Sequence, residues 1–543
     1  MTKFVWKVKS KAPIKKNKDW LLKILAENRG LTTPKKIKDF LNPTIDQILE
    51  VKISDLEKGK KRVITAIKAK EKCVVYSDYD ADGLNATAIM WETLYDLGAN
   101  ILPYVPHRIT EGYGLSKAGI EKLAREGVKL IITVDNGVTA VEQVDFAKSL
   151  GVDVVITDHH VLPKIPPKSY ALVHTTELCG AGVSWRFCWQ IIETLKPDYK
   201  EKLTDKLELA AIATVADLMP LVGANRAVVK LGLEKLRKTK RPGIKALITE
   251  SRINGPITTY EIGHIIAPRI NAMGRIEHGI DALRLLCAKS EEQANSLAKL
   301  LGKTNVRRQD LTIKAVDHAI SMVDKSSIIG VISHEEWHEG IIGLVASRLV
   351  EAHYRPMIVI SKGVTFSKGS ARSIAGFNIV EAIRESSEYL VDGGGHPMAA
   401  GFTIETKHIE MFKEKIIKYA ESKITEEILT PTIEVECELE KEDMTEANVK
   451  AVGTFEPYGI ANPLPLFLTR RMIVEDVRGV GPQSRHLKLQ LDGIGAIGFN
   501  IGNMRTEIRP GSLIDLVYTL EDDKYAGNGT IQLKIRDLVV NSN

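Results

Sequence analysis

Three carboxylates, Asp78, Asp80 and Asp82, occupy alternate positions directly after the short apolar run of residues 73–76. The run has the composition of a buried β-strand, and it predicts a strand that leads the carboxylates into the turn before a helix beginning near Leu84. Like charges this close repel one another unless something positive lies among them. The pattern therefore indicates a divalent metal ion, although Asp and Gly at such a position can also form only a turn and a helix N-cap.

Acidic and imidazole groups also follow two later apolar runs. Asp135 follows the predicted strand at residues 129–134, and the Asp-His-His triplet at residues 158–160 follows the predicted strand at residues 152–157. Neighbouring parallel strands place their carboxyl ends side by side, so we expect these groups and the three aspartates to meet at one edge of a sheet. A histidine pair can also be purely structural, and the two other carboxylate-tipped strands weigh against that alternative.

A further carboxylate, Asp217, follows the predicted helix at residues 207–216. Pro220 disfavours helical geometry in the residue before it, so Asp217 should lie near the helix end, where it can turn inward. With the other groups it completes a set of carboxylates and imidazoles that suits two divalent ions. The five cysteines are scattered and form neither CxxC pairs nor zinc spacings, so the expected metal is Mg²⁺ or Mn²⁺.

The elements that must position these residues have the pattern of an α/β protein. Between residues 46 and 223, apolar strands alternate with amphipathic helices, which predicts a parallel sheet built from βαβ units. Residues 224–325 are predicted to be mostly helical and to end in one long connecting helix at about residues 290–323. Residues 326–425 have the pattern of a second, smaller α/β domain.

The C-terminal part, residues 426–543, has a different pattern. Apolar and polar residues largely alternate with a period of two at residues 433–439, 487–491, 513–518 and 531–535. This alternation predicts a small β-barrel of the OB type, a fold that commonly binds single-stranded nucleic acid but also serves as an inert cover. The side chains available to a groove for the strand are Arg470, Arg471, Arg485, His486, Lys488 and Tyr525.

Three segments contain residues suited to phosphate. Arg108 follows the predicted strand at residues 101–106, where a solvated surface arginine is the alternative that position alone favours. In the smaller α/β domain, Ser370 and Arg372 stand in a predicted glycine-flanked loop, and three glycines before His396 predict a turn. Successive glycines expose backbone N–H groups, so this domain favours a phosphate site over a simple turn.

Residues 334–338 match the H-E-x-x-H pattern of zinc peptidases. That motif requires the interior of a helix. Here it directly follows a predicted strand at residues 327–332 and precedes Gly340, so we reject a zinc site at this position.

Length and composition limit the class of protein. The 543 residues predict several domains, and a net charge of +6 is compatible with a polyanionic partner without proving one. No segment reaches the ~18 consecutive apolar residues of a membrane span. Residues 1–45 are predicted to form a basic N-terminal arm and a short helical lead without the apolar core of a signal peptide, so we expect a cytoplasmic protein with reduced cysteines.

The motifs above resemble those of the DHH phosphoesterase superfamily in order and spacing. The four that carry the resemblance are residues 78–83 (DYDADG), 134–137 (VDNG), 158–160 (DHH) and 213–217 (ATVAD). Three further segments make the resemblance more specific: residues 337–348, 393–396 and 455–459. With them, nearly the whole chain resembles the branch of single-strand-specific exonucleases. The resemblance implies a DHH-type parallel-sheet domain (46–223), a helical region with a connecting helix (224–325), a DHHA1-like domain (326–425) and an OB-like nucleic-acid-binding domain (426–543).

The resemblance also implies a role for the residues at these motifs. It implies one or two Mn²⁺ or Mg²⁺ ions held by Asp78, Asp80, Asp82, Asp135, His159 and Asp217. The residues expected to act in catalysis are Asp80, Asp135, His159, His160 and Asp217, with His160 facing the scissile phosphate. Relatives outside this branch carry a histidine where this chain has Val74, and Asp82 is expected to compensate for it. The residues expected to bind substrate phosphate are Arg108, Arg275, Ser370, Arg372 and His396.

The function implied is a single-stranded-DNA-specific 5′→3′ exonuclease that uses two-metal-ion catalysis and releases 5′-mononucleotides in DNA recombination and repair. The implied partners are single-stranded DNA, a single-strand-binding protein and a helicase, with no membrane, and we expect a monomer. One alternative is a phosphoesterase for short oligonucleotides or other small phosphate substrates, which the barrel and the chain length disfavour. A second is a non-catalytic DNA-binding scaffold, which the complete carboxylate set disfavours.

Overall fold

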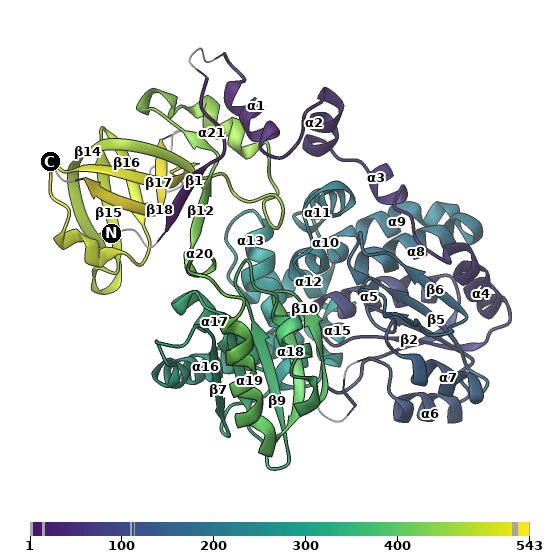
Figure 1. Cartoon of the computed structure of the whole chain (residues 1–543). Helices are drawn as coiled ribbons and strands as arrows, with labels where there is room; N and C mark the ends of the chain where they lie inside the picture. The colour runs from purple at the N-terminus through teal and green to yellow at the C-terminus, as the bar shows by residue number, and fades with distance from the viewer. Residues whose placement is uncertain (1–3, 14–16, 109–110, 113, 524–529, 542–543) are drawn as a thin grey trace. The chain divides into compact units, whose positions relative to one another are not determined.

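The computed structural model describes residues 4–13, 17–108, 111–112, 114–523 and 530–541. It divides into two compact units, and each is described by itself (Figure 1). Unit 1 comprises Met1–Asn28, Arg307–Gly453 and Pro465–Asn543, and unit 2 comprises Arg29–Val306 and Thr454–Leu464.

Unit 2 is built around the predicted parallel sheet. Its strands lie in the order β3-β2-β4-β5-β6, and each pairs in parallel with its neighbours. The strands that lead to Asp78, Asp135 and Asp158 are therefore adjacent, as the sequence predicts. The strand bounds are β2 Lys72–Tyr76, β3 Asn100–Tyr104, β4 Leu130–Val134, β5 Asp153–Asp158 and β6 Ala171–His174.

Helices cover both faces of this sheet (Figure 1). Alternate strand residues belong to different cores: Val75 and Ile132 pack with α5, α8 and α10, whereas Val74 and Ile131 pack with α6 and α7. Because both faces are buried, the strands are continuous apolar runs in the sequence. The helix bounds are α5 Ala81–Asp96, α6 Lys117–Arg125, α7 Val141–Ser149, α8 Gly180–Leu195 and α10 Leu207–Ala216.

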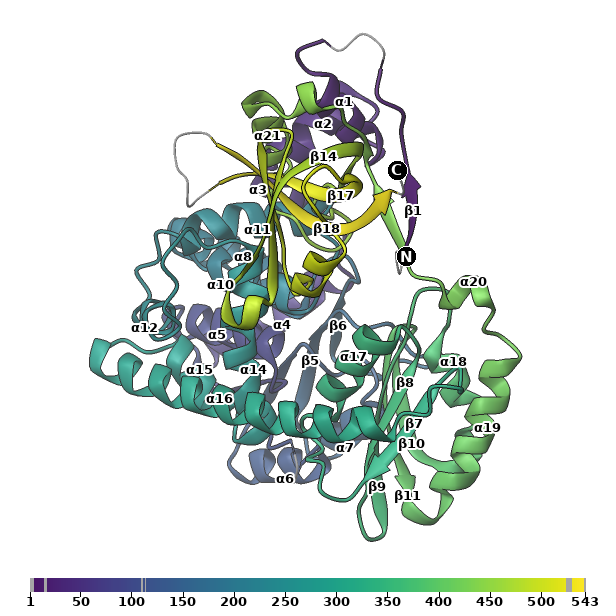
Figure 2. The ribbon, with the colours of Figure 1, turned by 90° about the vertical axis from the view of Figure 1, so that its left-hand side faces the viewer.

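The rest of unit 2 is helical, as predicted. It includes α11 Gly223–Leu236, α12 Pro242–Glu250, α14 Ala267–Ile276 and α15 Ile280–Leu286. The predicted connecting helix is α16, Glu291–Met322, which is continuous over 32 residues (Figure 2). None of the helices in the described ranges is long and apolar enough to cross a membrane.

Unit 1 contains a second sheet, of order β10-β11-β9-β8-β7, in which β7 and β8 pair in parallel and the other neighbours are antiparallel. Two predictions about this region are wrong. Ser370 and Arg372 lie in strand β9 rather than in a loop, and the three glycines before His396 lie in strand β10 rather than in a turn. The strand bounds are β7 Gly330–His334, β8 Met357–Ser361, β9 Phe366–Arg372, β10 Leu390–His396 and β11 Ala399–Glu405.

The C-terminal barrel of unit 1 follows the order β13-β14-β15-β16-β18-β17, and pairing between β14 and β17 closes it. The predicted strand at residues 433–439 is in fact two: β12 Thr432–Val435 lies outside the barrel, and β13 Cys437–Glu438 pairs with β14. The remaining bounds are β14 Phe467–Val480, β15 His486–Leu491, β16 Ile494–Gly498, β17 Leu513–Asp522 and β18 Ile531–Asn541.

The predicted basic N-terminal arm contains a strand that the sequence analysis missed. Strand β1, Val5–Val8, pairs in parallel with β12. The indole Nε1 of Trp6 donates a hydrogen bond to Asp537 Oδ2 at 2.7 Å, and Lys9 forms an ion pair with Glu434 at 2.8 Å. The start of the chain is thus fixed to the barrel region by main-chain and side-chain contacts.

Candidate metal centre

The acidic turn after β2 begins helix α5 earlier than predicted. The helix starts at Ala81 rather than near Leu84, because Asp80 serves as its N-cap. The Asp80 side chain accepts a hydrogen bond from the backbone N–H of Gly83 at 3.0 Å. Asp82 therefore lies in the first turn of the helix and not in the turn before it.

Asp78 is held where the strand meets the helix. Its Oδ1 accepts a hydrogen bond from the backbone N–H of Tyr79 at 2.6 Å, and its side chain is buried. A Cβ atom at Gly83 would lie 2.7 Å from the Asp78 Cβ. Glycine at position 83 therefore allows the first turn of α5 to pack directly against Asp78.

Helix α8 supports the cluster from a second direction. The carboxylate of Asp82 accepts hydrogen bonds from the backbone N–H groups of Gly180 and Ala181, both at 2.7 Å. These N–H groups belong to the first turn of α8, where they have no acceptor within the helix. A Cβ at Gly180 would lie 2.6 Å from the Cβ of Asp135, so glycine is also required for this approach.

Asp135, directly after β4, has a left-handed backbone with a φ of 62°. A non-glycine residue in this region carries a strain of order 1–3 kcal/mol that the surrounding structure must offset. Here the Asp135 N–H donates to the carbonyl of Thr157 at 3.0 Å, and the side chain is only 2% exposed. The backbone thus turns this carboxylate inward at the carboxyl edge of the sheet.

His159 connects the carboxylates of the different elements. Its Nε2 lies 3.1 Å from Asp135 Oδ1 and 3.7 Å from carboxylate oxygens of Asp82 and Asp217. Three groups offer ligand atoms that all lie within 4.8 Å of one another: Asp78–Asp80–Asp135, Asp82–His159–Asp217 and Asp135–His159–His160. All the residues predicted to hold metal are therefore brought together, at the site that the strand ends predict.

Among the described residues, the positive charges near this cluster do not offset the burial and mutual repulsion of its carboxylates. Burial, and next the repulsion from neighbouring aspartates, raises the pKa of Asp82 to about 7 and that of Asp217 to about 8. The same two causes raise the pKa of Asp78 and Asp135 well above the ordinary range. A divalent cation would relieve this repulsion, and the donors, carboxylate oxygens with imidazole nitrogen, fit Mn²⁺ or Mg²⁺.

Asp158 is a residue of this site to which the sequence analysis gave no role. It is buried, and its Oδ1 lies 2.8 Å from His160 Nδ1, while its Oδ2 accepts the backbone N–H of Val138 at 3.0 Å. Burial disfavours the charged form of His160, but the hydrogen bond and ion pair with Asp158 outweigh it and raise the pKa of His160 to about 9. His160 is thus a cation at neutral pH, oriented by Asp158. The signal was present in the Asp-His-His triplet itself.

Two of the predicted phosphate residues lie beside the acidic turn in unit 2. The guanidinium carbon of Arg108 lies 5.1 Å from the ring centroid of Tyr79, the residue between Asp78 and Asp80. Burial raises the pKa of Tyr79 to about 12, and the positive charges of Arg108 and Arg275 act to lower the same pKa. Arg108 and Arg275 therefore both lie near Tyr79.

The other predicted phosphate residues lie in unit 1. Arg372 Nη1 donates to the hydroxyl of Ser370 at 3.3 Å and to the carbonyl of Ala371 at 2.8 Å. A Cβ at Gly343, near the start of α17 (Ile342–His353), would lie 3.0 Å from both the Ser370 Oγ and an Arg372 nitrogen. Burial lowers the pKa of Arg372, and within the described residues no carboxylate forms an ion pair with it.

His396 lies on the same sheet as Ser370 and Arg372. It is opposite Ala399 in the β10–β11 pair, and Ala399 is opposite Arg372 in the β11–β9 pair. The sheet therefore places His396 and Arg372 at the same level, with one strand between them. His396 is exposed at the end of its strand, as a residue that contacts a ligand must be.

Comparisons with known families match all three parts of the chain. The model of the DHH family, N-terminal domain, matches residues 72–214, the DHHA1 domain matches residues 324–422, and the RecJ OB domain matches residues 435–537. The single-stranded-DNA-specific exonuclease RecJ of Haemophilus influenzae is 31% identical over 543 residues, which cover 92% of each chain. The chain belongs to the RecJ family. The predicted fold class, with its DHH, DHHA1-like and OB-like parts, is confirmed.

Other RecJ proteins differ from this chain in length. RecJ of Bacillus subtilis is 36% identical over 95% of this chain, and RecJ of Thermus thermophilus is 34% identical over 81% of it. The chain spans 66% and 65% of the length of these two relatives, respectively. A crystal structure of T. thermophilus RecJ in complex with Mn²⁺ matches with a TM-score of 0.87 at 29% identity, and it covers 100% of this chain and 80% of that chain.

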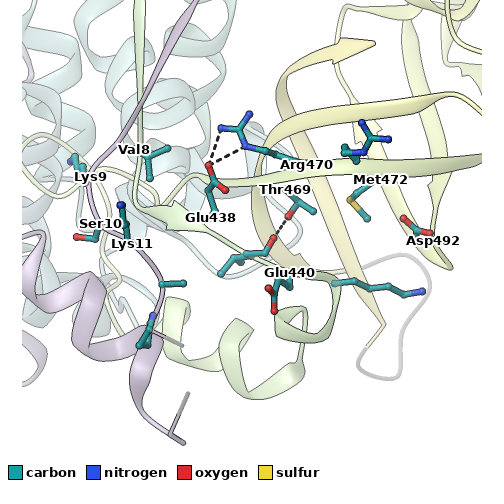
Figure 3. A pocket seen from close by; sticks show the side chains of 15 residues that line it. Val8, Lys9, Ser10, Lys11, Glu438, Glu440, Thr469, Arg470, Met472 and Asp492 are labelled. Atoms are coloured by element: carbon teal, nitrogen blue, oxygen red, sulfur yellow. Dashed lines mark hydrogen bonds and ion pairs between the residues drawn. The ribbon is translucent and has the colours of Figure 1, made fainter. Parts of the chain in front are cut away.

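The barrel that the RecJ OB model matches has a cavity of about 910 Å³ beside strand β14 (Figure 3). Residues 8–13 of the N-terminal segment line it together with Arg470 and Arg471. Arg470 is already paired, with Glu438 at 2.9 Å and Asp515 at 3.4 Å. Of the other predicted groove residues, Arg485, His486 and Lys488 are not among those that line this cavity, and Tyr525 lies outside the described residues.

Proposed function

We propose that this chain is a metal-dependent 5′→3′ exonuclease that acts on single-stranded DNA and releases 5′-mononucleotides in DNA recombination and repair. The observation that carries the proposal is the cluster of five carboxylates and two imidazoles at the carboxyl ends of β2, β4 and β5. Burial and mutual repulsion raise the pKa of its carboxylates despite the positive charges of His160 and Arg108 nearby. Membership of the RecJ family, whose named relatives are single-stranded-DNA-specific exonucleases, supports the choice of substrate.

The metal would be Mn²⁺ or Mg²⁺, one or two ions. When bound, such ions activate water and stabilise the charge that develops on a phosphodiester during hydrolysis. Hydrogen bonds hold three of the carboxylates before any ion arrives: Asp78 by the Tyr79 N–H, Asp80 by the Gly83 N–H, and Asp82 by the first turn of α8. The expected ligands are Asp78, Asp80, Asp82, Asp135, His159 and Asp217.

His160 would face the scissile phosphate as a cation. Asp158 accepts from its ring, so the positive charge is retained at neutral pH and the ring orientation is fixed. A cation preorganised in this way favours the negative charge of the reacting phosphate without reorganising during the reaction. The role requires no proton transfer by His160.

Phosphate groups of the strand would be bound by guanidinium and hydroxyl groups, in each unit by itself. Arg108 and Arg275 lie beside the acidic turn in unit 2, and the buried Arg372 with Ser370 in unit 1 has the composition of an anion site. His396, exposed on β10, would add a contact to phosphate. Recognition of a 5′-phosphate at a fixed distance from the metal would yield one nucleotide at a time.

The barrel would hold the incoming strand by electrostatics and base stacking, an attachment that weakens as salt rises. The finer predictions also belong to this proposal: a monomer in the cytoplasm that cooperates with a single-strand-binding protein and a helicase. The five cysteines, all among the described residues, form no disulfide, and four of them are buried, which is consistent with a reducing compartment.

The test is digestion of a 3′-labelled single strand of a few tens of nucleotides with Mn²⁺, with and without a 5′-phosphate. Asp135→Asn is the matched variant, because asparagine keeps the size and tolerates the left-handed backbone at this position. Asp145→Ala, an exposed aspartate on α7, is the control. A ladder that shortens from the 5′ end in the wild type and the control, but not in Asp135→Asn, supports the proposal. Hydrolysis of dinucleotides alone would instead support the small-substrate alternative.

A further inference from the structure

Helix α14 carries the sequence Pro268-Arg-Ile-Asn-Ala-Met-Gly-Arg275, of which only Arg275 has so far been given a role. The two arginines have different surroundings. Arg269 forms an ion pair with Glu250 at 2.8 Å within unit 2, whereas the positive charge of Arg275 acts to lower the pKa of Tyr79. The residues between them contact the backbone from which the three aspartates of the acidic turn project.

Asn271 binds the peptide between two of the aspartates. Its Oδ1 accepts a hydrogen bond from the backbone N–H of Ala81 at 2.7 Å. Ala81 is the first residue of α5, so its N–H has no acceptor within the helix. The N-cap residue Asp80 already uses its own side chain for the Gly83 N–H, and a second acceptor from another helix is therefore needed.

The carbonyl group of Ala81 also forms a hydrogen bond with a side chain. The Nδ2 of Asn85, one turn along α5, donates to the Ala81 carbonyl at 2.7 Å. The two peptide planes that flank Ala81 thus each carry a side-chain amide bond, one from α14 and one from α5. These planes set the directions of Asp80 and Asp82, because each plane is directly bonded to the Cα of one of the two.

Gly274 and Gly279 bring the α14 region close to the same segment. A Cβ at Gly274 would lie 2.3 Å from the carbonyl oxygen of Tyr79, and one at Gly279 would lie 3.4 Å from it. Backbone therefore packs on backbone here, and a side chain at position 274 would displace the segment that carries Asp78 and Asp80. Gly274 and Asn271 thus contact the two peptide groups that flank Asp80.

We propose that Asn271 is a positioning residue for the metal ligands, and that α14 holds the acidic turn in its metal-binding geometry through this one hydrogen bond and the Gly274 contact. The inference rests on the proposed function, since it presumes that the cluster binds metal. Carboxylates that repel one another spread apart unless their backbone is fixed, so losing the bond should weaken metal binding. Hydrogen-bond partners of metal ligands are typically worth 10–100-fold in affinity.

Asn271 and Arg275 are four residues apart and therefore lie on one face of α14. The same helix would then set the distance between the metal ligands and the predicted contact to the terminal phosphate. This arrangement explains why an asparagine, a glycine and an arginine occur together in one helix turn.

The test is a Mn²⁺ titration by calorimetry on the full chain, with three substitutions. Asn271→Leu keeps the branching at Cγ and removes the acceptor; leucine is larger, but the position is half-buried and can accommodate it. Asn271→Asp keeps the acceptor. The control is Asn378→Leu, because Asn378 also accepts backbone N–H groups at a helix start, from Val380 and Glu381, but does so in unit 1.

We expect the Mn²⁺ dissociation constant of Asn271→Leu to be 10–100-fold higher than that of the wild type. The constant of Asn271→Asp should be no more than about threefold above the wild-type value, and that of Asn378→Leu should be unchanged. Nuclease activity of Asn271→Leu should recover at raised Mn²⁺, with an unchanged KM for DNA. Equal Mn²⁺ affinity of wild type and Asn271→Leu would overturn the inference, whereas no binding by wild type would overturn the proposed function instead. If Asn271→Leu does not fold, Asn271→Ala is judged by the same criterion.

Discussion

The two ends of helix α5 both contain buried charges, but the charges are arranged in opposite ways. At the start of the helix, Asp82 belongs to a cluster of carboxylates whose pKa values are raised. Near its end, Glu92 accepts hydrogen bonds from Lys206 at 2.8 Å and from Arg241 at 2.7 Å. The pKa of Glu92 is lowered to about 2, because these bonds and charges outweigh the cost of burial.

The comparison distinguishes charged groups that pair with one another and stabilise the fold from charged groups that can bind a ligand. In the Glu92 network, two cations face Glu92 and Glu208, so the group is neutral and complete within the protein. In the acidic cluster, the positive charges of His160 and Arg108 act on Asp78, and the pKa values of Asp78, Asp82, Asp135 and Asp217 are nevertheless raised. Burial of charged groups alone therefore does not indicate a binding site. An excess of buried charges of one sign indicates that a ligand of the opposite charge binds there.

The largest expected effect is on catalysis at the acidic end. Asp135→Asn should lower nuclease activity on the order of 10³-fold, because it removes a metal ligand shared by two of the three ligand groups. Single-turnover rates on a 5′-phosphorylated strand measure the loss. Residual activity within tenfold of wild type would place the chemistry elsewhere.

At the other end of α5, Glu92→Gln should destabilise the fold by about 3–5 kcal/mol, since it leaves the buried Lys206 and Arg241 without their shared partner. Urea unfolding measures the change in free energy. The matched control is Glu121→Gln, which breaks an exposed pair with Arg125 and should cost less than about 1 kcal/mol. Equal costs for the two substitutions would show that burial does not distinguish these pairs.

Metal should stabilise one end of α5 only. Mn²⁺ at 100 times its dissociation constant is expected to raise the free energy of unfolding by about 2.7 kcal/mol. The gain should persist in Glu92→Gln and disappear in Asp135→Asn. A thermal shift with Mn²⁺ and EDTA checks this, and a full shift in Asp135→Asn would remove Asp135 from the ligand set.

The smallest expected change in stability, counted per pH unit, is the pH dependence of the metal-free protein. The pKa of Asp217 is about 8 in the folded state against an ordinary value of 3.8, so the native state binds more protons between these values. Stability should therefore fall as pH rises through this window, with a slope of up to about 1.4 kcal/mol per pH unit for each such carboxyl. Asp217→Asn should flatten the slope in urea melts, and saturating Mn²⁺ should abolish it. A free energy of unfolding that rises with pH across this window would contradict the repulsion between carboxylates in the folded state.

The Glu92 network should respond to pH in the opposite sense. Its lowered pKa contributes stability above the ordinary value of 4.5 that is lost as pH falls toward 2. Acid unfolding should therefore begin at this end of α5, where the carboxylate is charged in the native state.

The sequence was sufficient to predict that these carboxylates and imidazoles lie together, because several of them follow strands whose apolar runs are buried on both faces. Asp135 and His159 come directly after such runs, and Asp217 follows a helix whose end the sequence predicts correctly. The start of α5 was misplaced, since an Asp at position 80 that caps the helix and one that only forms a turn have the same local sequence. The distinction depends on the Asp80 to Gly83 hydrogen bond.

The strand β9 could not be recognised locally. Its sequence around Gly369, with lysine and two serines, is typical of a loop. In the structure the ring of Phe402 covers this glycine, where a Cβ would lie 2.1 Å from the ring, and β8 and β11 pair on either side. Long-range pairing thus overrode local composition, as it often does in strands. The Glu92 network was missed for a similar reason, because its members come from three separate helical segments.

The pairing of β1 with β12 has a consequence for the synthesis of the chain. Residues Val5–Val8 leave the ribosome before their partners, Thr432–Val435, which follow more than 400 residues later. At roughly 5–20 residues per second, the first strand waits on the order of 20–85 s for its partner. During that interval its backbone groups must be satisfied by water or by a chaperone. Strand β1 can therefore reach its final structure only after residues 432–435 have left the ribosome.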